Sequence, residues 1–258
     1  MRKPGRLALS VLGMALALPA FADMRPSITF SDFSYTVADL TPDDGFAANA
    51  LLGSWSGTLS TTRQVPGQRS LYDEEEFDSV LQPPLSSSYL DGALSAASSQ
   101  PGGIGNLDTW VQGTEPAFGP TPEWQTNALS ATAVGTVNFY IGAYSAVTVS
   151  WRGVSRIERN SLESGLFAAR TQMYFSSYPY GTSLPNSSTF LRGSEGPFLE
   201  DEILLSYTFE NNSPRAIVQS VTARGSVTLQ PIMPVPEPSA WAMLGAGLIL
   251  LRRRMRGR

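Results

Sequence analysis

Carboxylates, hydroxyls and arginines are the only side chains through which this chain could carry out chemistry. The 258 residues include no His and no Cys, and the single Lys is Lys3. The lack of His excludes Ser-His-Asp triads and imidazole metal ligands, and the lack of Cys excludes thiolate nucleophiles, disulfides and zinc knuckles. Lys3 lies in a segment that we expect to be removed, which excludes lysine chemistry from the mature protein. We therefore predict a protein with no catalytic residues and no cofactor.

Two acidic clusters could bind a cation. Asp39, Asp43 and Asp44 offer oxygen ligands of the kind that calcium takes, but their spacing differs from the EF-hand pattern. A turn around Pro42 would also account for these residues, because Pro, Asp and Gly are favoured in turns. The acidic segment 73–78 is interpreted as a solvated loop. A pair of carboxylates could also hydrolyse a glycosidic bond, but no motif selects such a pair. We predict no metal site.

Aromatic rings in loops could bind a carbohydrate by stacking. Trp110 and Trp124 lie in loop-like sequence and are the candidate glycan-binding residues. Trp151 shares the alternation of Val147 and Val149, so it is predicted to lie in the core. The other aromatic candidates are Tyr174, Tyr178 and Tyr180.

Strands must position these side chains, because apolar residues alternate with polar ones along much of the chain. A change of phase at Ser31-Asp32 predicts a β-bulge, and Leu51, Trp55 and Leu59 are expected on one face. Segments 203–209 and 217–229 are predicted to form a hairpin. We expect seven or eight short strands in an antiparallel β-sandwich, for which a jelly roll is one possible arrangement.

Residues 62–127 carry the weakest strand signal. We interpret this stretch as long loops, with one or two edge strands and a short helix near residues 89–97. The whole of residues 23–233 is predicted to form one domain. By count, it holds 10 Arg and no Lys against 21 acidic residues, a net charge of −11. So negative a surface argues against nucleic acid and anionic lipid as partners of the domain.

The N-terminus has the organisation of a secretory signal peptide. Arg2, Lys3 and Arg6 precede an apolar stretch from Leu7 to Pro19, and Ala20-Phe21-Ala22 provides the small residues of a cleavage site. The apolar stretch would span only about 20 Å as a helix, which is short for a membrane anchor. We therefore predict that residues 1–22 are removed and that the protein is exported.

The C-terminus, residues 234–258, has three parts in order. A proline cluster at 234–238 keeps the chain extended. An apolar run, Ala240–Leu251, would span about 18 Å as a helix, less than the roughly 30 Å hydrocarbon core of a bilayer. An arginine cluster closes the chain and is expected to stay on the cytoplasmic side.

This order of motif, short apolar segment and basic end resembles the PEP-CTERM protein-sorting signal of Gram-negative bacteria. The resemblance implies a sorting motif of Pro236, Glu237 and Pro238 and a basic stop of Arg252, Arg253 and Arg254. It also implies exosortase, a membrane processing enzyme, as a partner. The protein is then expected to be held transiently at the inner membrane before it reaches the cell surface or the medium. Family members are exported by bacteria that make exopolysaccharide or biofilm, so we expect a structural or adhesive matrix component. The alternative is a secreted polysaccharide-binding module.

Overall fold

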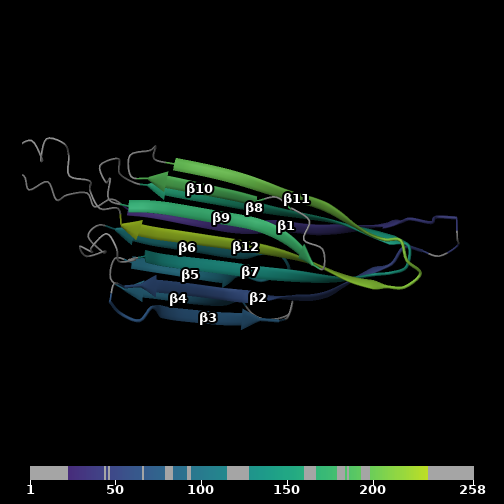
Figure 1. Ribbon diagram of the computed structural model, residues 1–258, viewed down its shortest axis with the longest axis horizontal. Helices are drawn as coiled ribbons and strands as arrows, with labels where there is room; N and C mark the ends of the chain where they lie inside the picture. The colour runs from purple at the N-terminus through teal and green to yellow at the C-terminus, as the bar shows by residue number, and fades with distance from the viewer. Residues whose placement is uncertain are drawn as a thin grey trace, which may run out of the picture.

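Antiparallel strands make up nearly all of the regular structure of this protein (Figure 1). The computed structural model describes residues 23–43, 45, 47–65, 67–78, 84–91, 94–114, 128–159, 167–178, 184, 186–192 and 198–231. These residues form two six-stranded sheets and no helix, so the predicted all-β fold class is confirmed. None of them belongs to a helix that could cross a membrane.

Sheet A has the strand order β11-β8-β1-β6-β5-β4, and sheet B has the order β10-β9-β12-β7-β2-β3. The strands of sheet A are β1 (Asp23–Asp39), β4 (Leu85–Asp91), β5 (Leu94–Gln100), β6 (Leu107–Thr114), β8 (Ser145–Arg159) and β11 (Phe198–Asn211). Those of sheet B are β2 (Ala50–Gln64), β3 (Leu71–Phe77), β7 (Ala128–Ile141), β9 (Phe167–Tyr178), β10 (Asn186–Arg192) and β12 (Ile217–Pro231).

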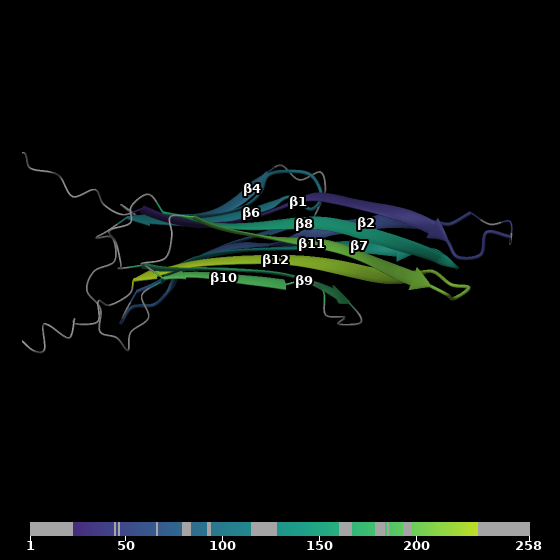
Figure 2. The same cartoon turned by 90° about the horizontal axis from the view of Figure 1, so that it is seen from above.

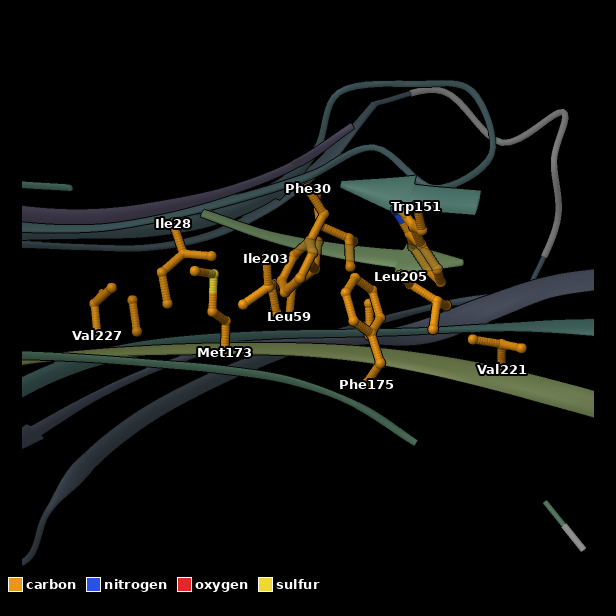
Figure 3. Packing of buried hydrophobic residues seen from close by; sticks show 14 of the residues in the cluster. Ile28, Phe30, Leu59, Trp151, Met173, Phe175, Ile203, Leu205, Val221 and Val227 are labelled. Atoms are coloured by element: carbon orange, nitrogen blue, oxygen red, sulfur yellow. The ribbon is translucent and has the colours of Figure 1, made fainter. Parts of the chain in front are cut away.

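The two sheets form two layers that enclose a shared hydrophobic core (Figure 2). Along most strands every second side chain is buried, as the period of a half-buried strand requires. Figure 3 shows Phe30 and Trp151 of sheet A pointing toward Met173 and Phe175 of sheet B. The rings of Phe30 and Phe175 meet edge to face with centroids 5.6 Å apart. Trp151 is fully buried, which confirms its predicted core position.

Inward-facing glycines make room for the largest rings of the core. A Cβ at Gly135 of β7 would overlap the ring of Trp55, and a Cβ at Gly153 of β8 would lie 2.9 Å from Phe30. The indole N–H of Trp151 donates to the carbonyl of Gly105 at 2.8 Å, so its one polar atom is satisfied inside the core. The bulk of these aromatic residues is thus accommodated by the absence of side chains opposite them.

The segment predicted as a solvated acidic loop is largely strand β3, at the edge of sheet B. Its carboxylates are exposed, and charged edge strands discourage pairing with other chains. Asp73 also links the two sheets, because its carboxylate accepts hydrogen bonds from Ser87 Oγ at 2.9 Å and from the backbone N–H of Ser88 at 3.1 Å. The prediction of solvation was right, and the prediction of a loop was wrong.

Within the described residues of 62–127, the predicted helix does not form and most of the predicted loop is strand, whereas the predicted edge strands are confirmed, because β4 and β3 are the edge strands of sheets A and B. Strands β3, β4, β5 and β6 lie in this stretch, and residues 89–97 contain the end of β4 and the start of β5, which pair with each other. Small residues hide this pattern, because β5 buries Ala96 and Ser98 where a strand signal normally needs large β-branched or aromatic residues. Twelve strands result, where seven or eight were expected.

The predicted hairpin between segments 203–209 and 217–229 does not form. β11 pairs with β8 in sheet A, while β12 pairs with β7 and β9 in sheet B. The connecting turn is well built: Asn211 Nδ2 donates to the carbonyls of Gly142 and Arg215 at 2.7 and 2.8 Å. Alternation reveals that two strands are half-buried but does not reveal which partner each one takes.

Two bulges set the side-chain phase. The first, between Ser31 and Ser34 of β1, confirms the predicted irregularity and holds Asp32 at a φ of 56°. The second, between Leu52 and Trp55 of β2, was not predicted. It turns Leu51 to solvent, with 62% of its surface exposed, so the expected common face of Leu51 with Trp55 is wrong.

Candidate functional site

Four inner strands of sheet B, β9, β12, β7 and β2, lie side by side (Figure 1). Their alternate, outward-facing residues form a broad polar surface. Its side chains are mainly hydroxyls because the outward positions of β7, β12 and β2 are largely Ser and Thr. We call this surface the hydroxyl face. Its hydroxyl residues are Ser56, Thr58, Ser60, Thr62, Ser130, Thr132, Thr136, Ser176, Ser220, Thr222, Ser226 and Thr228.

Strand register brings these hydroxyls into rows. Thr132 Oγ1 lies 3.0 Å from Ser226 Oγ, and Thr136 Oγ1 lies 2.8 Å from Thr222 Oγ1. A hydroxyl has one donor and two acceptor sites, so each member of such a pair keeps hydrogen-bonding capacity for a further group. The rows therefore present fixed donors and acceptors to a ligand lying on the sheet.

Two arginines are the only charged side chains that the four inner strands place on the hydroxyl face, within the part of the chain that the structure describes. Arg170 lies on β9 and Arg224 on β12, and both are exposed. The Arg224 guanidinium lies over the ring of Tyr174 at 5.9 Å from its centroid, in the range of a cation–π contact. Tyr174 is itself 37% exposed, so aromatic surface remains open beside the charge.

Arg170 lines a shallow groove at the β9 and β12 end of the face. The other lining residues are Ala168, Gln172, Ser188, Thr228 and Gln230. Guanidinium, amide and hydroxyl groups thus converge on one groove without a carboxylate among these lining residues. Arg170, Arg224 and Tyr174 were not predicted together, although Tyr174 was among the aromatic candidates. The signal that could have found them is the lack of acidic residues at the outward positions of 168–178 and 220–230.

The outer face of sheet A is organised differently, because two of its arginines, Arg152 and Arg156, are paired with acids. Arg152 Nε donates to Glu202 at 2.9 Å and Arg156 Nε donates to Glu200 at 2.6 Å. Asp32 lies 3.7 Å from Arg152. The hydrogen bond from Arg152 lowers the pKa of Glu202, and the same contact raises the pKa of Arg152. Positive charge on this part of sheet A is compensated within the fold.

Of the two candidate glycan-binding residues, Trp110 is within the described part of the chain. It lies on β6, and the prediction of a loop at this position is wrong. Its ring is half-buried on the outer face of sheet A, with the Arg25 guanidinium 5.1 Å from the centroid. Trp124 lies outside the described residues, as do the sorting motif Pro236–Pro238 and the basic stop Arg252–Arg254.

A second group of polar residues lies between the sheets near β4. Arg63 points inward from β2 and donates to the carbonyls of Gln64 and Ala128 at 2.6 and 3.2 Å. Burial lowers the pKa of Arg63. Burial, and then the neighbouring Asp91, raise the pKa of the Tyr89 phenol, which donates to Asp91 at 3.2 Å. Through the hydrogen bond between Arg63 and Tyr89, this group links β2 to β4.

The acidic turn at residues 39–45 is organised by its own backbone. Asp39 Oδ1 accepts the backbone N–H of Thr41 at 2.8 Å, which is the Asx-turn arrangement. Asp44 lies outside the described residues. Among the residues that the structure does describe, no group of three or more acidic side chains is placed to hold a metal ion.

Comparison of the chain with protein-family models, with curated proteins and with solved structures finds no match. The hydroxyl face, with Arg170, Arg224 and Tyr174, is therefore identified by its own geometry and charge.

Proposed function

We propose that this protein is exported cargo of the PEP-CTERM sorting system. The signal peptide at 1–22 would direct export, and the tail at 234–258 would hold the chain at the inner membrane until exosortase processes it. Pro236, Glu237 and Pro238 would be the recognised motif, Ala240–Leu251 a short membrane helix and the arginines the stop. This proposal is supported by the order of the three parts in the sequence.

The two-sheet domain would then act at the cell surface or outside the cell as a structural or adhesive component of the exopolysaccharide matrix. A β-sandwich with two outer faces suits this role, because one face can bind the matrix while the other remains exposed to solvent. The jelly-roll arrangement is untested and stays a prediction. A jelly roll has eight strands, and the described residues form twelve. The role requires no catalysis, and we propose that the protein is not an enzyme.

The hydroxyl face is the single observation that carries the domain's proposed role. A surface rich in hydroxyls, with no acid on its inner strands in the described part of a strongly acidic chain, is suited to hydrogen bonding with polysaccharide hydroxyls. The same observation favours the alternative, a secreted polysaccharide-binding module. The two differ in whether the protein remains in the matrix or is released as a soluble binder.

Intact masses in the native host test the sorting proposal. The full chain is expressed with and without exosortase, and the membrane and extracellular fractions are measured by mass spectrometry. We expect a form lacking both ends outside the cell only when exosortase is present. Glu237→Ala should retain the unprocessed chain at the membrane, whereas Glu210→Ala, an equal loss of charge on exposed β11, should be processed normally. An unprocessed C-terminus in both strains would contradict the proposal.

A further inference from the structure

We propose that Arg170, Arg224 and Tyr174 form a binding site for a carboxylated, acidic polysaccharide that lies along β9 and β12 on the hydroxyl face. This inference rests on the proposed function and names the class of polysaccharide. It is carried by an imbalance of charge: residues 23–233 have a net charge of −11, yet both charges on the four inner strands of this face are positive.

Within the described part of the chain, neither of the two arginines forms an ion pair with an acid. The ion pairs of the described residues all involve Arg152 or Arg156 on sheet A. The nearest outward carboxylate in the row of Arg224 is Glu76 of β3, which is three strands away through Val134 and Thr58. With strands roughly 4.8 Å apart, the backbones of Arg224 and Glu76 are about 14 Å apart.

The geometry fits an extended chain better than a compact anion. Arg170 and Tyr174 are four residues apart on β9, about 14 Å, and Arg224 is the cross-strand partner of Tyr174. The two arginines thus extend from backbone positions about 14 Å apart, a spacing that suits a polymer with repeated carboxylates better than one small anion. Guanidinium groups bind carboxylates through paired, charge-assisted hydrogen bonds.

The polar side chains between the arginines suit sugar hydroxyls. Gln172 faces Ser226 across the strands, and Ser188 continues the same row on β10. These amide and hydroxyl groups line or adjoin the groove beside Arg170. Tyr174 offers an open aromatic surface next to Arg224. Nucleic acid would need a much larger excess of positive charge than two arginines in an acidic domain provide.

Binding of polygalacturonate to the purified full chain tests the proposal, with dextran as a neutral polymer and duplex DNA as a non-saccharide polyanion. Affinity is measured by isothermal titration calorimetry at low and at physiological ionic strength. We expect polygalacturonate to bind and dextran and DNA to bind at least tenfold more weakly. The double variant R170Q/R224Q should lose about tenfold or more in affinity for polygalacturonate, since it removes both charge-assisted contacts.

The matched control is R152Q/R156Q, which removes the same charge from the outer face of sheet A. It should bind polygalacturonate within about twofold of the unaltered chain. Far-UV circular dichroism and thermal unfolding of both double variants confirm that each is folded, as expected for exposed positions.

Four results would overturn the proposal: absence of polygalacturonate binding, equal binding of dextran or DNA, unchanged affinity of R170Q/R224Q, or equal losses in the two double variants. Because purified protein is used, each of these results is distinguishable from failure of sorting in the host.

Discussion

The outer faces of the two sheets differ in what the fold has done with their arginines. On sheet A, Arg152 and Arg156 contact Glu202 and Glu200. On sheet B, Arg170 and Arg224 lie among hydroxyls and amides, and no ion pair to either is formed among the described residues. On sheet A the charges of Arg152 and Arg156 are thus compensated by neighbouring acids, whereas within the described residues those of Arg170 and Arg224 on sheet B are not.

The difference teaches that a protein's net charge is a poor description of its surfaces. Exposed ion pairs contribute little to stability, so the pairs on sheet A matter chiefly because they occupy groups that could otherwise bind anions. The charge of −11 over residues 23–233 would exclude an anionic partner if it were spread evenly. It does not exclude an anionic partner at the hydroxyl face, because arginines are the only charged side chains that the described inner strands carry there.

The largest effect on stability is expected from a substitution in the core that the two sheets share. Gly135→Ala places a methyl group inside the ring of Trp55, and overpacking of this kind costs about 1–3 kcal/mol. Urea unfolding of the full chain measures the free energy of unfolding. Gly53→Ala is the control, because its Cβ meets only the exposed, movable ring of Tyr140 and the carbonyl of Asn138, and it should change stability by less than about 0.5 kcal/mol. Equal stabilities of the two variants would contradict the packing described for the core.

A carboxylate introduced on the hydroxyl face of sheet B should pair with an arginine there, as Glu202 and Glu200 pair with arginines on sheet A. Thr228 is the cross-strand partner of Arg170, so Thr228→Glu creates an ion pair and repels an acidic ligand. We expect polygalacturonate affinity to fall about tenfold, or 1.4 kcal/mol, in calorimetric titrations. Thr62→Glu adds the same charge to the same face, but its backbone lies three strands, about 14 Å, from that of Arg170. It should have a much smaller effect. Similar losses in both variants would indicate general repulsion in place of a local site.

One aromatic residue on each face sharpens the comparison further. Tyr174→Ala removes the contact with Arg224, and exposed cation–π contacts of this kind correspond to about two- to fivefold in affinity. Tyr174→Phe keeps the ring and should keep the affinity. Trp110→Ala on sheet A should leave polygalacturonate binding unchanged. A loss on Trp110→Ala with none on Tyr174→Ala would move the binding site to sheet A.

The smallest effect is expected from the surface ion pair on sheet A. The pKa of Glu202 is lowered in the folded protein from its ordinary value of 4.5, so the pair stabilises the fold above that value. The contribution is lost as the pH falls through the lowered pKa, when Glu202 becomes protonated. Glu202→Gln should therefore reduce the melting temperature slightly at pH 7 and not at pH 2. A larger difference at pH 2 than at pH 7 would contradict this assignment.

Alternation along the chain was enough to predict the all-β class, the core position of Trp151 and the bulge after Ser31. It could not predict that β11 and β12 belong to opposite sheets, because both are half-buried with the same period. It also failed for β5, where the buried residues Ala96 and Ser98 are too small to give the usual strand signal. Sequence pattern reports burial, and the choice of partner depends on packing across the whole domain.

The candidate site was less predictable than the fold. Trp110 was predicted to bind a glycan because tryptophan rings stack on sugars. Its ring is half-buried and lies beneath Arg25, so little of its surface is free. Arg170 and Arg224 are 54 positions apart and meet on one face only through the pairing of β9 with β12. What identifies them is the absence of acids from the described inner strands of this face, and that property depends on strand order.

Arginine modification with and without polygalacturonate tests the central claim most directly. Phenylglyoxal is applied to the full chain, and mass spectrometry of its peptides gives the extent of modification at each arginine on both faces in one experiment. We predict that polygalacturonate protects Arg170 and Arg224 and leaves Arg25 on sheet A as reactive as before. Protection of Arg25 alone, or equal protection of all three, would contradict a binding site on the hydroxyl face of sheet B.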